Sequence, residues 1–232
     1  MDSLRAVFLD VGGPLYPDEN FLGAAHQAIN TLRADGGEEP VAFERVRELF
    51  DWVRNTEGAS MRKTFAREFL GSEDAAPGLH REIAPLWRHP EGTLYPDVIP
   101  FLEAVSRFVP IGIIANQESE TKDALIRDGV ARYISSWGLS ALVGHEKPKP
   151  EIFHWALSDL GVEPADAIHI GNRFDTDVLP ARSLGLKTGW ILRGEAPDHP
   201  PAEALALATL AAPTLAELTP LLVPLLAHGL PH

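Results

Sequence analysis

Short apolar runs that end on polar residues recur along the chain and alternate with stretches of helical periodicity. The runs predict buried strands over four segments, residues 6–9, 111–116, 167–170 and 187–192. The apolar positions of the other stretches predict helices at 97–108, 118–127, 152–160, 181–184 and 215–226. We also expect a short strand at 141–143, before a proline-rich loop. This alternation is typical of an α/β domain with a parallel sheet covered on both faces.

Residues 17–93 interrupt the alternation, because no strand pattern occurs between the first strand and the second. Apolar side chains recur there at helical spacing, over residues 21–32, 41–55, 60–70 and 79–87. We therefore predict two domains. Residues 1–16 and 94–232 form the α/β core, and residues 17–93 form a helical insertion.

The first apolar run ends on Asp10, which is followed by a Gly-Gly-Pro turn at residues 12–14. Asn116 follows the second strand in the same way, and Asn172 and Asp177 follow the third. The carboxyl ends of parallel strands lie at one edge of the sheet, where α/β proteins bind their ligands. We expect these side chains to converge there, although a single Asp before a glycine turn more often only caps the turn.

The composition excludes several classes of partner and site. A formal net charge of −13 disfavours a nucleic acid or an anionic membrane as the main partner. The chain has no cysteine, which excludes disulfides and cysteine-ligated metals and fits a cytoplasmic location. Prolines interrupt the apolar tract at 202–227, so we expect no membrane span. The oligomeric state stays open.

The chain resembles the haloacid dehalogenase superfamily in four motifs, FLDVGGPL, GIIANQ, EKPKPEIF and HIGNRFDTDV, over about residues 5–193. Members of this superfamily are mostly phosphatases. The resemblance implies their fold class, an α/β Rossmann-like parallel sheet with an inserted α-helical cap, here residues 17–93. It implies that Asp10 is a nucleophile that forms a covalent aspartyl ester. Lys147 would neutralise both this carboxylate and the transferred group.

The resemblance also implies a metal ion and an anionic substrate. It places Mg²⁺ on the four residues Asp10, Gly12, Asn172 and Asp177, with Gly12 contributing its carbonyl oxygen. It places the substrate beside Gly12, Gly13 and Asn116. Arg62, in the predicted cap, is a further candidate to bind an anionic substrate. Lys63 and Arg67 lie on the same predicted helix, however, and such charges more often only solvate a helix face.

Three residues depart from the phosphatase motifs. Gly12 stands where phosphatases have a second aspartate that protonates the leaving group, and general acid–base assistance is typically worth ~10²–10⁴ in rate. Ala115 replaces a hydroxyl residue, and Asn172 replaces a carboxylate. Mg²⁺ prefers carboxylate oxygens, so we predict a weak magnesium site. The residues that could substitute for the missing acid are Glu118, His145 and Glu146.

Three functions are compatible with these motifs. The first, which we favour, is a weak or specialised magnesium-assisted phosphatase of small metabolites. The second is a catalytically impaired protein that keeps the site for binding or regulation. The third is a metal-independent hydrolase similar to the 2-haloacid dehalogenases, which also use an aspartate and a lysine and lack the second aspartate.

Overall fold

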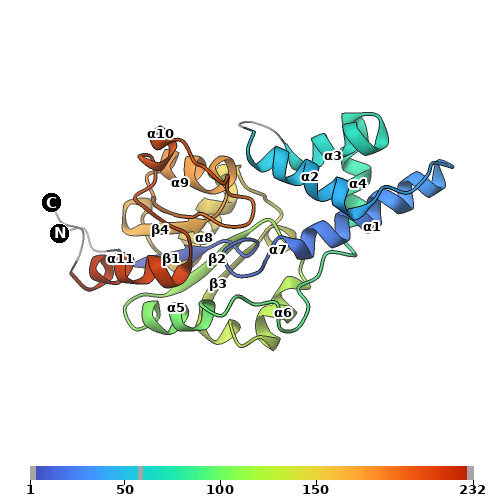
Figure 1. Ribbon diagram of the computed structural model, residues 1–232. Helices are drawn as coiled ribbons and strands as arrows, with labels where there is room; N and C mark the ends of the chain where they lie inside the picture. Colours follow the sequence, from blue (N-terminus) through green and yellow to red (C-terminus); the bar gives the residue numbers. More distant parts are fainter. Residues whose placement is uncertain (1–3, 57–59, 229–232) are drawn as a thin grey trace. The chain divides into compact units, whose positions relative to one another are not determined.

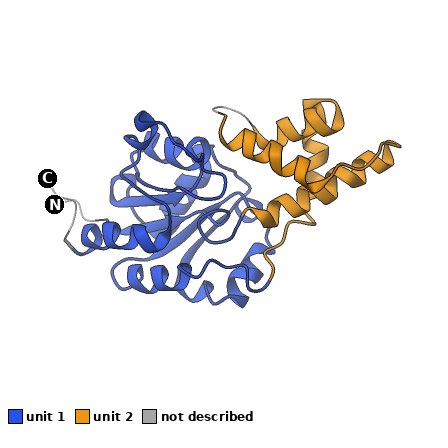
Figure 2. Cartoon of the chain, in the orientation of Figure 1, with its two compact units in different colours: residues 1–17, 91–232 blue, residues 18–90 orange. Residues whose placement is uncertain are grey.

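The chain forms two compact units in the computed structural model, which describes residues 4–56 and 60–228 (Figure 1). One unit contains residues 1–17 and 91–232, and the other contains residues 18–90 (Figure 2). Most of the segment between the first and second strands, residues 18–90, is therefore a unit of its own.

The larger unit is built on a six-stranded sheet whose strands are all parallel and follow the order β3-β2-β1-β4-β5-β6. The strands are β1 (Ala6–Leu9), β2 (Ile111–Ala115), β3 (Ile134–Leu139), β4 (Ala167–Gly171), β5 (Lys187–Ile191) and β6 (Leu210–Ala212). β1 lies at the centre and pairs with β2 and β4. The strand order reverses beside β1, which makes its carboxyl end the expected ligand-binding position of such a sheet. The predicted Rossmann-like parallel sheet is confirmed.

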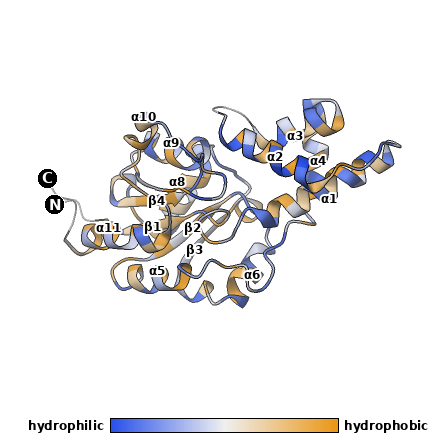
Figure 3. Ribbon diagram, viewed as in Figure 1, coloured by the Kyte–Doolittle hydropathy of each residue, from blue (hydrophilic) through white to orange (hydrophobic). Residues whose placement is uncertain are grey.

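Helices cover both faces of this sheet. They are α5 (Val98–Val105), α6 (Thr121–Arg127), α7 (Ser140–Val143), α8 (Pro150–Leu160), α9 (Leu179–Ser183), α10 (Ala202–Leu205) and α11 (Leu215–His228). Val7 and Leu9 of β1 pack in one apolar cluster with residues of α5 and α11. Ala6 and Phe8 pack in another with residues of α8 and α9, on the opposite face (Figure 1). Because β1 is buried on both faces, its sequence is a continuous apolar run (Figure 3).

The smaller unit is helical and has its own apolar core. Its helices are α1 (Glu19–Asp35), α2 (Phe43–Arg54), α3 (Met61–Leu70) and α4 (Ala76–Ile83). Ile29, Phe65 and Leu79 are fully buried in one cluster to which all four helices contribute. The helical character that the periodicity predicts is present, and the function of this unit as a cap stays a prediction.

One predicted element is wrong. Residues 141–143 do not form a strand but belong to the helical turn α7, and the strand is β3, directly before it. A run of three apolar residues is too short to distinguish a strand from a helix. Leu142 is half exposed, as expected of a short surface helix rather than a buried strand. No helix in the described part of the chain is long and apolar enough to cross a membrane.

Candidate active site

Three strand ends bring polar side chains to one edge of the sheet. Asp10 directly follows β1, Asn116 follows β2, and Asn172 follows β4. The amide of Asp10 donates a hydrogen bond of 2.8 Å to the carbonyl of Ile170, which continues the pairing of β1 with β4 beyond the strand. The sheet register therefore fixes the backbone of Asp10 beside the segment that carries Asn172.

Lys147 joins two carboxylates at this edge. Its Nζ lies 2.9 Å from Oδ1 of Asp10 and 2.5 Å from Oδ1 of Asp177. The side chains of Lys147 and Asp177 are almost fully buried, and that of Asp10 is 12% exposed. The three residues come from three distant parts of the sequence, so the convergence expected at the sheet edge is present. Asp10 is the member of the group that keeps contact with solvent.

Asp177 is held on all sides by donors. It lies on a π-helical turn, η4 (Phe174–Val178), which directs its carboxylate back toward β4. Its Oδ2 accepts a hydrogen bond of 2.9 Å from the backbone amide of Arg173, and its Oδ1 lies 3.0 Å from Nε2 of His169. A Cβ atom on Gly171 would lie 2.2 Å from Cγ of Asp177, so only glycine fits there. These contacts orient the carboxylate toward Lys147.

Burial and pairing move the pKa values of this cluster in opposite directions. Burial raises the pKa of Asp10 to about 7, since desolvation and the nearby Asp177 outweigh the effect of Lys147. Burial alone would also raise the pKa of Asp177, but Lys147 and His169 hold it below its usual range. Burial alone would lower the pKa of Lys147, yet its two carboxylate partners raise it. The lysine is therefore an ammonium ion at neutral pH, and Asp177 is its permanent counterion.

His169 is a neutral partner of this network. The residue lies within β4, is buried, and packs edge-on against the ring of Phe153. Burial lowers its pKa. Because the ionised Asp177 can only accept, the proton of His169 must be on Nε2, and Nδ1 has no hydrogen-bond partner among the described residues. Sequence reasoning missed His169, because it occupies one position of an otherwise apolar strand.

Asn116 fixes the segment that carries the lysine. Its Oδ1 accepts a hydrogen bond of 2.7 Å from the backbone amide of Lys147, and its Nδ2 donates one of 2.8 Å to the carbonyl of the same residue. Both ends of the carboxamide are thus used in positioning Lys147. The substrate contact that we predicted for Asn116 stays a prediction, and positioning is the role that its contacts favour.

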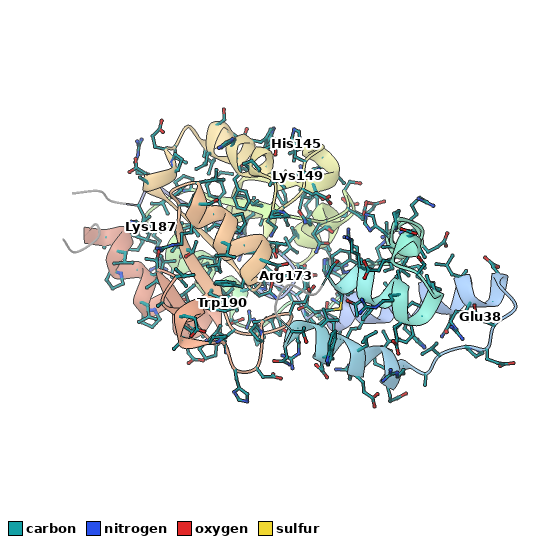
Figure 4. All side chains as sticks on the ribbon, turned by 90° about the horizontal axis from the view of Figure 1, so that it is seen from above. Glu38, His145, Lys149, Arg173, Lys187 and Trp190 are labelled. Carbon is teal, nitrogen blue, oxygen red and sulfur yellow. The ribbon has the colours of Figure 1, made fainter. Side chains whose placement is uncertain are left out.

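The glycine turn after Asp10 packs against Asn172. Gly13 has a φ of 79°, and a Cβ atom on it would lie 2.0 Å from Nδ2 of Asn172. That amide nitrogen donates to the carbonyl of Arg193, and the carbonyl of Asn172 accepts from Nε1 of Trp190 at 2.9 Å. Trp190 and Arg173, the residue that follows Asn172, are labelled in Figure 4. The turn and the segment after β4 therefore fit together only with glycine at position 13.

The other residues that the sequence suggested for the site lie outside this cluster. Glu118 follows β2 and is half-buried, whereas His145 and Glu146 are exposed in the loop before Lys147. Arg62 lies on α3 of the smaller unit. The roles of these residues in acid catalysis or substrate binding stay predictions.

The oxygens at this edge fit a weakly bound Mg²⁺. Asp10 offers a carboxylate and Asn172 an amide oxygen, and Mg²⁺ typically uses one or two carboxylates and keeps several water ligands. Both oxygens of Asp177 already accept hydrogen bonds, so its contacts favour holding Lys147 over binding a metal directly. The described residues contain no group of three or more His, Cys, Asp and Glu side chains that could hold a metal. We therefore expect Mg²⁺ to bind weakly, because few negatively charged side chains at this edge of the sheet are available to it.

Known proteins resemble this chain in both sequence and fold. The chain is 33% identical over 205 residues to the phosphoserine phosphatase of Thermus thermophilus. This alignment covers 85% of this chain and 76% of the relative. It is 30% identical over 207 residues to the glyceraldehyde 3-phosphate phosphatase of Methanopyrus kandleri, and this alignment covers 85% of this chain and 88% of the relative. A haloacid dehalogenase-like hydrolase of Streptococcus pneumoniae has the same fold, with a TM-score of 0.71 at 21% identity over 96% of this chain and all of the other.

The family assignment follows from the length of the match. A model of the family described as haloacid dehalogenase-like hydrolases matches residues 4–185, which include Asp10, Lys147 and Asp177. The two relatives above cover more than two thirds of the chain, and both are named as phosphatases. The chain therefore belongs to the haloacid dehalogenase-like hydrolases, as its motifs predicted.

Proposed function

We propose that this protein is a phosphatase of small phosphorylated metabolites that acts through Asp10. The observation that carries the proposal is the buried ion pair between Asp10 and Lys147 at the carboxyl end of the central strand. Asp10 is the most exposed member of the cluster, so it is the group that a substrate can best reach. The phosphatase names of the relatives support the same reaction class.

The carboxylate of Asp10 would attack the phosphorus atom while the bond from phosphorus to the leaving oxygen breaks and the leaving group takes the electron pair. Lys147 stays protonated because of its two carboxylates, and its charge opposes that of the phosphoryl oxygens. Water then attacks the phosphorus of the aspartyl phosphate, which releases phosphate and restores the carboxylate of Asp10. Asp177 keeps the ammonium in place throughout, because it does not need to change its protonation state.

We propose that Asp10, Asn172 and the carbonyl of Gly12 hold Mg²⁺ weakly beside the substrate. When bound, the ion would neutralise charge on the phosphoryl oxygens. The protein side chains provide less negative charge than a site with several carboxylates, because Lys147 already balances one of the two aspartates. We therefore expect saturation with Mg²⁺ only at high concentration.

The reaction should favour leaving groups that need no proton. The cluster contains no efficient general acid for them, since the raised pKa of Lys147 makes its ammonium a poor acid, Asp177 is ionised and His169 donates its proton to Asp177. Position 12, two residues after the nucleophile, is glycine. Acyl phosphates and aryl phosphates release stable anions, whereas alkyl phosphates such as phosphoserine depend more on general acid catalysis. We therefore expect the former to be the better substrates.

A substrate panel tests this proposal. Wild type and Asp10→Asn would be assayed with acetyl phosphate, p-nitrophenyl phosphate, phosphoserine and glyceraldehyde 3-phosphate, each with Mg²⁺ and with a chelator. The proposal expects saturable turnover that Mg²⁺ increases and that Asp10→Asn abolishes. Chloride release from 2-chloropropionate in the presence of the chelator would instead support a dehalogenase. Absence of turnover with every compound would support a binding or regulatory protein.

A further inference from the structure

Arg193 connects the turn after the nucleophile to the rest of the core. It lies two residues beyond β5, and its side chain is 15% exposed. Its Nε donates a hydrogen bond of 3.0 Å to the carbonyl of Gly13, and a terminal nitrogen donates one of 2.5 Å to the carbonyl of Pro14. The guanidinium group thus binds two successive carbonyls of the turn that follows Asp10.

The same guanidinium group is anchored from the other side by Asp97. Its two terminal nitrogens lie 3.0 and 3.2 Å from the two carboxylate oxygens of Asp97, which is a bidentate pair. Its carbon lies 3.9 Å from the centre of the ring of Tyr95. Asp97 in turn accepts hydrogen bonds from the amides of Leu215 and Ala216 at the start of α11. Arg193 therefore has a fixed orientation that does not depend on the turn.

The backbone of Arg193 reaches a third element of the site. Its carbonyl oxygen accepts a hydrogen bond of 3.2 Å from Nδ2 of Asn172, the residue whose side chain packs against Gly13. One residue thus contacts the turn after β1 through its side chain and the segment after β4 through its backbone. The distance between these two segments determines where the carboxylate of Asp10 lies relative to Asn172.

We propose that Arg193 is a positioning residue that holds the turn at residues 12–14 so that Asp10 keeps a productive orientation. The proposal rests on the proposed function for its effect on turnover, whereas its effect on the turn does not depend on activity. A misplacement of about 1 Å at a reacting group can lower a rate by ~10²-fold. A lysine at this position could not reproduce the planar fork that reaches two carbonyls and a carboxylate together.

The test compares Arg193→Met with Arg182→Met. Arg182 lies on α9, and its side chain donates a hydrogen bond of 3.1 Å to the carbonyl of Leu207. Backbone amide exchange would be measured at Gly13, Leu15 and Tyr16, whose amides form the hydrogen bonds of the turn. Turnover of p-nitrophenyl phosphate would be measured on the same samples, at a temperature where both variants are folded.

We expect Arg193→Met to accelerate exchange at these amides by at least tenfold without a matching change at β1 or β4, and to lower kcat at least tenfold with KM within threefold. Arg182→Met should change neither. If Arg193→Met does not fold, Asp97→Asn replaces it and should raise exchange in the turn more than in the strands. Unchanged exchange in the turn, or an equal rise at all core amides, would overturn the inference. Absence of turnover in wild type would overturn the proposed function alone.

Discussion

The ammonium nitrogen of Lys147 lies 2.9 Å from a carboxylate oxygen of Asp10, and the same nitrogen also binds Asp177. Asp10 is the more exposed of the two carboxylates and has the raised pKa, whereas Asp177 is buried and has a lowered pKa. The cluster thus contains one carboxylate suited to react and another suited to hold the lysine. This asymmetry is the basis of the predictions that follow.

Replacing Lys147 should damage both stability and activity. Lys147→Met leaves Asp10 and Asp177 buried without a cation, and breaking a buried ion pair costs about 3–5 kcal/mol. Lys149→Met is the matched control, because Lys149 is exposed and two residues away in the same loop. Urea unfolding at pH 8 should show the loss only for Lys147→Met. Equal stability of the two variants would contradict the assigned role of Lys147.

The pKa of Asp10 predicts how stability changes with pH. The unfolded chain ionises Asp10 near 3.8, whereas the folded protein retains the proton up to about pH 7. Between these values the folded state binds more protons, so the contribution of Asp10 to stability falls as pH rises and levels off above 7. Asp10→Asn should therefore gain stability relative to wild type over this window, by an amount on the order of a few kcal/mol. Thermal unfolding from pH 5 to 8 measures this difference, and a constant difference would contradict the raised pKa.

Activity should also depend on the ionisation of Asp10, but it should rise with pH where stability falls. Only the ionised carboxylate of Asp10 can attack phosphorus, so kcat/KM should rise as pH increases through about 7. Bound Mg²⁺ would stabilise the carboxylate and move this rise to lower pH. A pH–rate profile with p-nitrophenyl phosphate at two Mg²⁺ concentrations checks both statements. A rate that falls across this range would exclude ionised Asp10 as the nucleophile.

The two adjacent glycines of the turn should respond differently to substitution. Gly12 does not have a positive φ, so Gly12→Asp is compatible with its backbone. A carboxyl group there could protonate the leaving group, and turnover of alkyl phosphates should rise by ~10²–10⁴ relative to aryl phosphates. Gly13→Ala should lower stability and activity, because its Cβ would collide with Asn172 and its φ is 79°. Parallel assays with phosphoserine and p-nitrophenyl phosphate would show both effects, and an unchanged substrate ratio in Gly12→Asp would contradict the first.

His169 should be neutral at pH 7, with its proton on Nε2. Burial lowers its pKa, and the ionised Asp177 accepts its hydrogen bond. The ¹⁵N chemical shifts of the imidazole ring distinguish the two tautomers and the charged form. His154 is exposed on α8 and serves as the internal comparison in the same spectrum. A charged His169, or one with its proton on Nδ1, at pH 7 would contradict this assignment.

The apolar runs predict β1, β2, β4 and β5, and they predict that Asp10 and Asp177 converge, because parallel strands deliver the residues that follow them to one edge of the sheet. The place of Lys147 beside them is implied by the resemblance to the family. The sequence does not predict β3, which contains two serines and a glycine and lies at the edge of the sheet, or β6, which has only three residues. It also misses His169 and Arg193. Their roles depend on contacts between residues far apart in the chain, which no local pattern of apolar and polar positions encodes.

A covalent intermediate on Asp10 is the most direct test of the proposed function. Wild type would be mixed with acetyl phosphate and Mg²⁺, quenched with acid within the first turnovers, digested and analysed by mass spectrometry. We predict a phosphoryl group on the peptide that contains Asp10, and none on the same peptide from Asp10→Asn. Steady turnover without this adduct, or wild-type turnover by Asp10→Asn, would contradict the account.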